Sequence, residues 1–332
     1  MNGNEHKIPT LVADIGGTNA RFAIADDGDS QDIHELRCAD FPTLETALEH
    51  YLDRLGGSRP RRAAIAVATP ITGDQVKMTN HVWSFSIRAV RQRLDLDELR
   101  VINDFTALAL SVPRLRADDL RQVGGGAPVP AAAIALIGPG TGLGASGLIP
   151  CGGRHVPLQS EGGHVTYGAT TRRESEVLAV IGRRYDHVSA ERLISGPGLV
   201  NLYTAIAEVE GAKPEQLRPP DISARAIAGG CPLCRQALDM FCAMLGTVAG
   251  NLVLTLGARG GVYIGGGIVP KLGDYFASSP FRARFEQRGR FSTYLAAVPS
   301  YVIQARLPAL RGAAAAFDYP AHEVGARSRR GD

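Results

Sequence analysis

The 332-residue chain has little of several features that would assign it to a specialised class of protein. Its five cysteines are scattered and odd in number, which is typical of reduced thiols in a cytoplasm. No run of about 18 apolar residues predicts a membrane span, and the polar N-terminus lacks the apolar core of a signal peptide. With 36 basic and 33 acidic residues, charge is nearly balanced. We therefore expect a cytoplasmic protein without a nucleic-acid or membrane partner.

The common metal and phosphate motifs are also missing. Cys231 and Cys234 form a CxxC, but no second Cys or His pair lies at zinc-finger spacing. We therefore favour buried or helix-start thiols over a zinc site. There is no GxxxxGK[ST] sequence, and no GxGxxG enters a helix in the first glycine turn. A P-loop is excluded, so any phosphate site must be built in another way.

Strand and helix patterns alternate along the chain, which predicts the α/β class. At 332 residues, about two domains are expected. A strand and then a helix are predicted in 34–56, with Thr43 as N-cap and Thr46 at the capping-box position. Further strands are expected at 62–72 and 260–270, a strand that turns helical after Asp104 in 100–113, and helices at 195–211 and 234–258, the last one buried. The charged tail 323–332 is expected to be disordered.

Two stretches share one layout, an apolar strand, a glycine turn and a second apolar strand. They are TLVADIGGTNARFAIAD (10–26) and AAIALIGPGTGLGASGLIP (132–150), and they suggest a duplicated domain with a cleft between the halves. Alone, the first turn is better explained by an ordinary hairpin. Backbone N–H groups of a glycine turn can nevertheless form a nest for anions, and a carboxylate such as Asp14 beside it can hold Mg²⁺ through water.

A third glycine cluster, Gly265–Ile268, lies in the predicted strand segment 260–270 and leaves room for a flat ring against the backbone. Three such clusters after apolar strands are hard to explain as turns alone. In the first two turns, the hydroxyls of Thr18 and Thr141 can contact phosphate. The predicted nucleotide-binding residues are Ala13, Asp14, Ile15, Gly16, Gly17, Thr18, Asn19, Gly138, Thr141, Gly142, Gly265, Gly266, Gly267 and Ile268.

Six sequence blocks together resemble the bacterial glucokinase family, in the group without the zinc-binding cysteine cluster. They are ADIGGTNARFAIAD, VINDFTALA, GPGTGLGAS, SEGGHVTY, HVSAERLISGPGLVNLY and GGVYIGGGIVP, with TPITGDQVKMTNHVWSFSI as a seventh. The resemblance runs from about residue 10 to 305. It implies an actin-like ATPase (ribonuclease H-like) fold with two α/β domains hinged around a cleft, ATP with Mg²⁺ as cofactors, and a homodimer.

The implied domains are a small one, 1–113 joined by the returning segment 304–332, and a large one, 114–303. The final segment departs from the family pattern, because Arg306 and Leu307 stand where the family usually has polar residues.

The resemblance also assigns roles in a sugar site. By this resemblance, Asp104 is the general base that accepts the proton of the sugar O6. An aspartate with an ordinary pKa of ~4 is ionised at neutral pH, as a base must be. Asn103 binds a neighbouring hydroxyl, and Glu161, His164 and Glu191 bind hydroxyls near the anomeric end. From the residues alone, Asp104 is explained equally well as a helix cap. For Glu191, the alternatives are a solvated surface charge or an ion pair with Arg192. The E-x-x-H spacing of 161–164 does not indicate a metal site, because two glycines disfavour a helix there.

The predicted function is ATP-dependent phosphorylation of D-glucose at O6, giving glucose 6-phosphate and ADP, the first step of glycolysis. Kinases for mannose, fructose or an amino sugar remain alternatives, although the missing zinc cluster favours glucose over amino sugars. A non-catalytic sugar sensor or an actin-like chaperone or filament ATPase is the other class. Sensors of this fold carry an added helix-turn-helix, for which the nine residues before the first strand leave no room.

Overall fold

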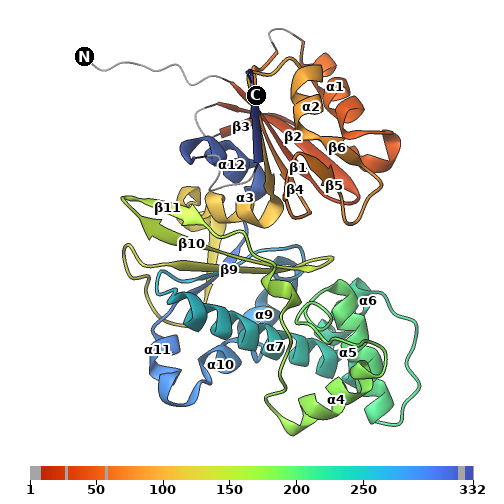
Figure 1. Ribbon diagram of the computed structural model, residues 1–332. Helices are drawn as coiled ribbons and strands as arrows, with labels where there is room; N and C mark the ends of the chain where they lie inside the picture. Colours follow the sequence, from red (N-terminus) through yellow and green to blue (C-terminus); the bar gives the residue numbers. More distant parts are fainter. Residues whose placement is uncertain (1–8, 27–28, 57–58, 321–325, 332) are drawn as a thin grey trace. The chain divides into compact units, whose positions relative to one another are not determined.

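The computed structural model describes residues 9–26, 29–56, 59–320 and 326–331, and these residues fall into two compact units (Figure 1). Unit 1 comprises 1–115, 154–159 and 305–332, and unit 2 comprises 116–153 and 160–304. Both units combine a mixed sheet with helices, so the predicted α/β class is confirmed.

The sheet of unit 1 has the strand order β14-β7-β4-β1-β2-β3. β2 is antiparallel to β1 and β3, whereas β1, β4 and β7 are mutually parallel neighbours. β1 and β4 read as almost continuous apolar runs and are buried nearly throughout, as expected for central strands covered on both faces. The strands are β1 (Thr10–Ile15), β2 (Asn19–Asp26), β3 (Asp29–Arg37), β4 (Arg62–Val67), β7 (Glu98–Asn103) and β14 (Ala326–Arg329), with a separate pair β5 (Gln75–Lys77) and β6 (Ser84–Ser86).

Helix α1 of unit 1 begins where its capping signal predicts. Thr43 is the N-cap of α1, and its hydroxyl accepts from the Thr46 backbone N–H at 3.3 Å while the Thr46 hydroxyl accepts from the Thr43 N–H. The predicted capping box is therefore confirmed. The helices are α1 (Leu44–Leu55), α2 (Ile87–Arg93), α3 (Asp104–Ser111) and α12 (Pro308–Ala315), with 3₁₀ turns η1 (Cys38–Asp40), η2 (Val112–Arg114) and η6 (Ala316–Asp318), and the short strand β11 (Arg154–Pro157) belongs to this unit.

Unit 2 repeats the arrangement of unit 1 around a second sheet. Its strands have the order β10-β9-β12-β13-β8, in which β9 forms an antiparallel hairpin with β10 and runs parallel to β12. β12 is in turn parallel to β13. The pattern of a hairpin beside two parallel strands thus occurs twice, as the sequence repeat predicts. The strands are β8 (Leu120–Val123), β9 (Ile134–Pro139), β10 (Leu143–Cys151), β12 (Val262–Ile264) and β13 (Ser300–Ile303).

Helices surround this second sheet and supply most of its core. They are α4 (Arg172–Gly182), α5 (Gly196–Val209), α6 (Pro219–Ile227), α7 (Pro232–Leu256), α8 (Val269–Leu272), α9 (Asp274–Ser278), α10 (Phe281–Glu286) and α11 (Ser292–Ala296), with 3₁₀ turns η3 (Ala117–Asp119), η4 (Gly162–His164) and η5 (Gly289–Phe291).

Helix α7 is long and apolar enough to cross a membrane by length and composition alone. However, 72% of its most apolar window is buried inside the protein, which is typical of a core helix. The predicted burial of this segment is confirmed. At its start, the Cys231 sulfur caps the helix by accepting from the Cys234 N–H at 3.3 Å, so this cysteine is a helix-start thiol.

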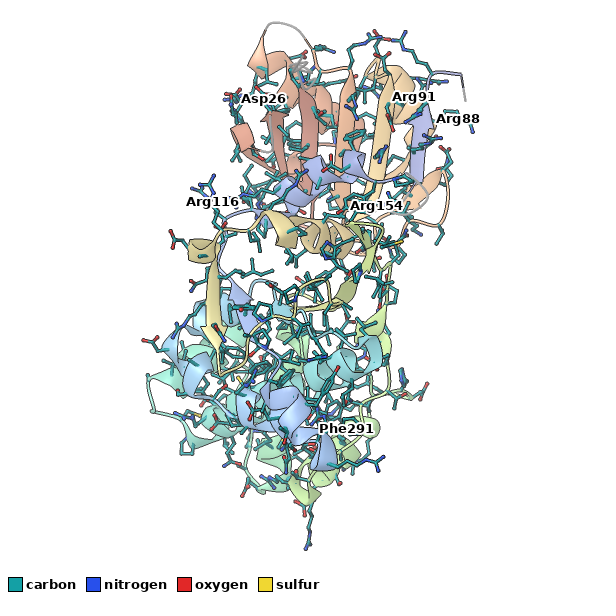
Figure 2. All side chains as sticks on the ribbon, turned by 90° about the vertical axis from the view of Figure 1, so that its left-hand side faces the viewer. Asp26, Arg88, Arg91, Arg116, Arg154 and Phe291 are labelled. Atoms are coloured by element: carbon teal, nitrogen blue, oxygen red, sulfur yellow. The ribbon has the colours of Figure 1, made fainter. Side chains whose placement is uncertain are left out.

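The prediction of a disordered tail is wrong for residues 326–329, which form β14 antiparallel to β7. Ser328 is buried there and accepts a hydrogen bond at 3.0 Å from the side chain of Arg91, which is labelled in Figure 2. Arg329 and Arg330 pair with Glu98 and with Asp97. Charges that suggested a solvated tail instead pair with acidic residues around an edge strand, where charged side chains are common. Residues 321–325 and 332 of the tail lie outside the described residues.

Helices α3 and α12 approach each other closely in unit 1. A Cβ added at Gly312 of α12 would lie 1.6 Å from the carbonyl oxygen of Ala107 in α3. Only glycine allows this contact, because the obstructing atom belongs to the backbone of a packed helix. Since α3 begins at Asp104, this contact also supports the position of the predicted base.

We expect Gly312→Ala to lower the free energy of unfolding by at least ~2 kcal/mol, because the new methyl group overpacks the helix contact. Thermal and denaturant unfolding would measure the loss. Gly182→Ala is the matched control, because Gly182 is a helical glycine with open space around its Cβ position. That control should be neutral or stabilising by up to ~1 kcal/mol. Equal stability of the two variants would contradict this account of the packing.

Candidate active site

In unit 1, the register of three parallel strands brings two predicted site segments to one edge of the sheet. Ile15 of β1 is level with Val67 of β4, which is level with Asn103 of β7. The turn that follows β1 and the start of α3 therefore lie at the carboxyl ends of neighbouring strands. In open α/β sheets, this is the edge at which ligands bind.

Cys38 makes two hydrogen bonds to the β1–β2 turn, residues 16–18. The Cys38 N–H donates to the Thr18 carbonyl oxygen at 2.9 Å, and the Cys38 thiol donates to the Gly16 carbonyl oxygen at 3.4 Å. Burial raises the pKa of this thiol, which keeps it protonated as a donor. Sequence reasoning missed this support, because nothing near Cys38 signals its contact with a turn 22 residues earlier. The Thr18 side chain is exposed and can reach a ligand.

Asp14 is the last but one residue of β1, with its side chain 19% exposed. Its Oδ2 lies 3.6 Å from the Arg21 guanidinium, which also binds Glu35 at 3.0 Å. Burial raises the pKa of the Asp14 carboxyl, and Arg21 acts in the opposite direction by favouring the ionised form. The described residues contain no cluster of three or more metal-ligating side chains. A single carboxylate beside a glycine turn fits Mg²⁺, which is commonly held by one or two carboxylates together with phosphates and water.

Asn103 and Asp104 mark the point where β7 becomes α3, as predicted. The Asn103 side-chain oxygen caps the helix by accepting from the Phe105 N–H at 2.8 Å and the Thr106 N–H at 3.2 Å. Asn103 therefore performs the capping role that the sequence left open for Asp104. The Asn103 amide N–H₂ group donates to the Thr69 carbonyl oxygen at 3.4 Å. Asp104 is half-buried and accepts from the Phe105 N–H at 2.9 Å.

In unit 2, the β9–β10 turn and the third glycine cluster are joined by backbone hydrogen bonds. Gly265 N–H donates to the Ile137 carbonyl oxygen at 2.9 Å, and Ile268 N–H donates to that of Pro139 at 3.3 Å. Parallel pairing of β9 with β12 sets this arrangement, with Ile137 level with Ile264. Gly138 and Gly265–Ile268 therefore lie together, and Thr141 is exposed at the tip of the turn. The structure thus brings these predicted nucleotide-binding residues into one cluster.

Glu161 and His164 lie on a single 3₁₀ turn, with 3.9 Å between Glu161 Oε2 and His164 Nε2. Both side chains are more than half exposed, at 57% and 60%. The glycines between them keep the turn short, as expected. Two exposed side chains at this spacing can each bind a hydroxyl group of a ligand.

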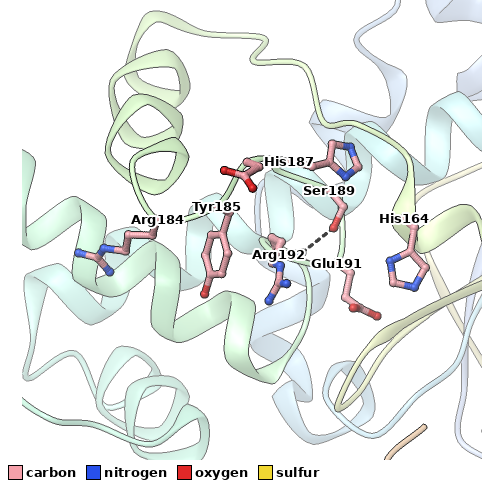
Figure 3. Close-up of a pocket in the computed structure, with 8 residues that line it drawn as sticks. His164, Arg184, Tyr185, His187, Ser189, Glu191 and Arg192 are labelled. Atoms are coloured by element: carbon pink, nitrogen blue, oxygen red, sulfur yellow. Dashed lines mark hydrogen bonds between the residues drawn. The ribbon is translucent and has the colours of Figure 1, made fainter.

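Glu191 and His164 line the same pocket of about 390 Å³ in unit 2 (Figure 3). The Glu191 carboxylate accepts from the Leu143 N–H of β10 at 2.9 Å. No ion pair joins Glu191 to Arg192 in the part of the chain that the structure describes; the Arg192 guanidinium lies over the Tyr185 ring, 4.2 Å from its centroid. The structure therefore brings together Glu161, His164 and Glu191, the three residues that the sequence predicts in unit 2.

The comparisons with known proteins decide the family. The glucokinase family model matches residues 11–319. The chain belongs to the glucokinase family. It is 58% identical over 320 residues to a glucokinase of Aromatoleum aromaticum, which covers 95% of this chain and 96% of that relative. The predicted family and enzyme class are confirmed.

Solved structures confirm the fold. A glucokinase from an Antarctic psychrotroph matches with a TM-score of 0.86 and 39% identity, over 93% of this chain and 98% of that one. A ROK family glucokinase from Streptomyces griseus, solved with glucose and AMPPNP, matches with a TM-score of 0.63 and 20% identity, over 92% and 98% of the two chains. The actin-like ATPase fold predicted from the sequence is thereby confirmed.

Two substitutions of Asn103 distinguish its role as a helix cap from its predicted hydrogen bond to a sugar hydroxyl. Asn103→Ser keeps an N-cap oxygen but removes the amide donor, whereas Asn103→Ala removes both. We expect both variants to raise KM for the hexose, and only Asn103→Ala to lose ~1 kcal/mol of unfolding free energy. Steady-state kinetics and thermal unfolding would measure the two effects. A normal hexose KM in Asn103→Ser would show that Asn103 is a cap only.

Proposed function

We propose that the protein transfers the terminal phosphoryl group of ATP to O6 of D-glucose, with Asp104 as the general base. Family membership over 11–319 is the observation that carries this proposal. The glycine turns at 16–18 and 138–142 hold the phosphates, and the cluster at 265–268 takes the nucleotide ring. ATP use is supported by the relative solved with AMPPNP.

The sugar hydroxyl is a poor nucleophile until its proton has an acceptor. Asp104 supplies a carboxylate at the first position of α3, and capping by Asn103 fixes the backbone from which it projects. In this proposal the amide N–H₂ of Asn103 donates to a neighbouring hydroxyl. Glu161, His164 and Glu191 bind hydroxyls near the anomeric end, because carboxylates can accept several hydrogen bonds at once.

Asp14 is the residue that we propose to hold Mg²⁺, through water. When bound, Mg²⁺ neutralises charge on the transferred phosphate. We further propose that the protein acts as a homodimer in the cytoplasm. The two-domain division predicted from the sequence, with boundaries near residues 113 and 304, is also retained as part of this proposal.

Asp104→Asn should lower kcat at least ~100-fold, because the amide cannot accept the O6 proton. Glucose should still bind within about tenfold of the native affinity, as measured by calorimetry. Asp118→Asn, which removes a charge from an exposed aspartate of η3, is the control and should leave kcat unchanged. Near-normal turnover in Asp104→Asn would rule out its role as the base.

Asp14→Asn should raise the Mg²⁺ concentration needed for half-maximal activity by at least ~10-fold, since residues that hold a metal through outer contacts typically contribute that much. KM for glucose should change little. Glu35→Gln is the matched control, because Glu35 shares Arg21 with Asp14 but is half exposed on β3. A similar Mg²⁺ requirement in both variants would place the metal elsewhere.

The choice of hexose is tested by a coupled assay with glucose, mannose, fructose and amino sugars. The proposal predicts the highest kcat/KM for glucose. A higher value for another hexose would favour the alternative kinase, and no turnover of any hexose would favour a sugar sensor.

A further inference from the structure

The β9–β10 turn, called here the phosphate turn after its proposed role, and the pocket of unit 2 lined by His164 and Glu191 share one carboxylate. Glu191 lines the pocket with His164, yet its Oε2 accepts from the backbone N–H of Leu143, the first residue after the β9–β10 turn. Its other oxygen, Oε1, makes no hydrogen bond to any part of the chain that the structure describes. One oxygen is therefore committed to the turn while the other is left for a ligand.

Gly142 makes this arrangement possible. A Cβ at position 142 would lie 2.5 Å from Glu191 Oε2 and 3.4 Å from Glu191 Cδ. These are the contacts within 4 Å, so a methyl group there would meet the end of the Glu191 side chain and not a packed backbone. The side chain would have to move, and its carboxylate would leave the Leu143 N–H.

The turn is fastened to the segment that carries Glu191 at a second point. Gly196 N–H donates to the Gly140 carbonyl oxygen at 2.8 Å, and Gly140 N–H donates to that of Gly142 at 2.8 Å, which closes the turn. On the pocket side, the Glu191 N–H donates to the Gly163 carbonyl oxygen at 2.9 Å, next to His164. Both the backbone and the carboxylate of Glu191 are thus fixed by hydrogen bonds.

We propose that Gly142 is a positioning residue for the hexose: the phosphate turn holds the Glu191 carboxylate in the orientation that binds the sugar. The inference rests on the proposed role of Glu191 as a sugar ligand. It adds that the turn affects the affinity for the sugar even when no nucleotide is bound. It also follows that the Leu143 N–H is already satisfied and is not a donor to phosphate.

The test is glucose binding without nucleotide, measured by isothermal titration calorimetry on the full chain. Gly142→Ala should weaken glucose binding at least tenfold, although residue 142 lies in the phosphate turn. Gly182→Ala is the control, because Gly182 lies in α4 outside this turn and the space around its Cβ position is open. It should change glucose binding less than twofold. Thermal unfolding of both variants checks that they are folded.

A double-mutant cycle with Glu191→Ala separates the possible failures. Glu191→Ala should weaken glucose binding, and adding Gly142→Ala to it should weaken binding no further, because the displaced group is gone. Native-like glucose binding in Gly142→Ala, together with weak binding in Glu191→Ala, would overturn the positioning role alone. Native-like binding in Glu191→Ala would overturn both this inference and the proposed role of Glu191. Additive losses would show that Gly142 acts independently of Glu191.

Discussion

The register between parallel strands is the constraint on which both halves of the candidate site depend. In unit 1 it makes Ile15, Val67 and Asn103 level, so that the first glycine turn and Asp104 emerge at one edge. In unit 2 it makes Ile137 and Ile264 level, which joins the second turn to the third glycine cluster. Because side chains alternate along a strand, a shift of one residue would reverse every face and separate these groups. The apolar strands are therefore as necessary to the chemistry as the polar residues that follow them.

Local signals explain what could be predicted from the sequence. The capping box of Thr43 and Thr46, the strand-to-helix change at Asp104 and the two hairpins each depend on residues a few positions apart. The family resemblance added the predicted sugar-binding roles of Glu161 and His164, which their local pattern does not indicate. The structure then places these two side chains 3.9 Å apart.

Contacts between distant residues explain what was missed. Cys38 reaches back 22 residues to the first turn, and Glu191 reaches back 48 to Leu143. Such pairs carry no periodicity or turn chemistry, and their formation depends on closure of the whole sheet. Strand β14 was missed for a different reason, because its arginines resemble those of a solvated tail until Glu98 and Asp97 are placed beside them.

The charges near the first turn bear on how the phosphate proposed to bind there would be held. Arg21, the cation that lies beside Asp14, already pairs with Asp14 and Glu35. It therefore has little charge to offer to an incoming triphosphate. Backbone N–H groups in the turn orient phosphate oxygens but carry only partial charges. In the proposed function, Mg²⁺ held by Asp14 would balance this charge, so the turn would supply geometry and the carboxylate beside it would hold the metal. In the second turn the roles differ, because its neighbouring carboxylate, Glu191, is already bound to the Leu143 N–H and lines the pocket that also contains His164.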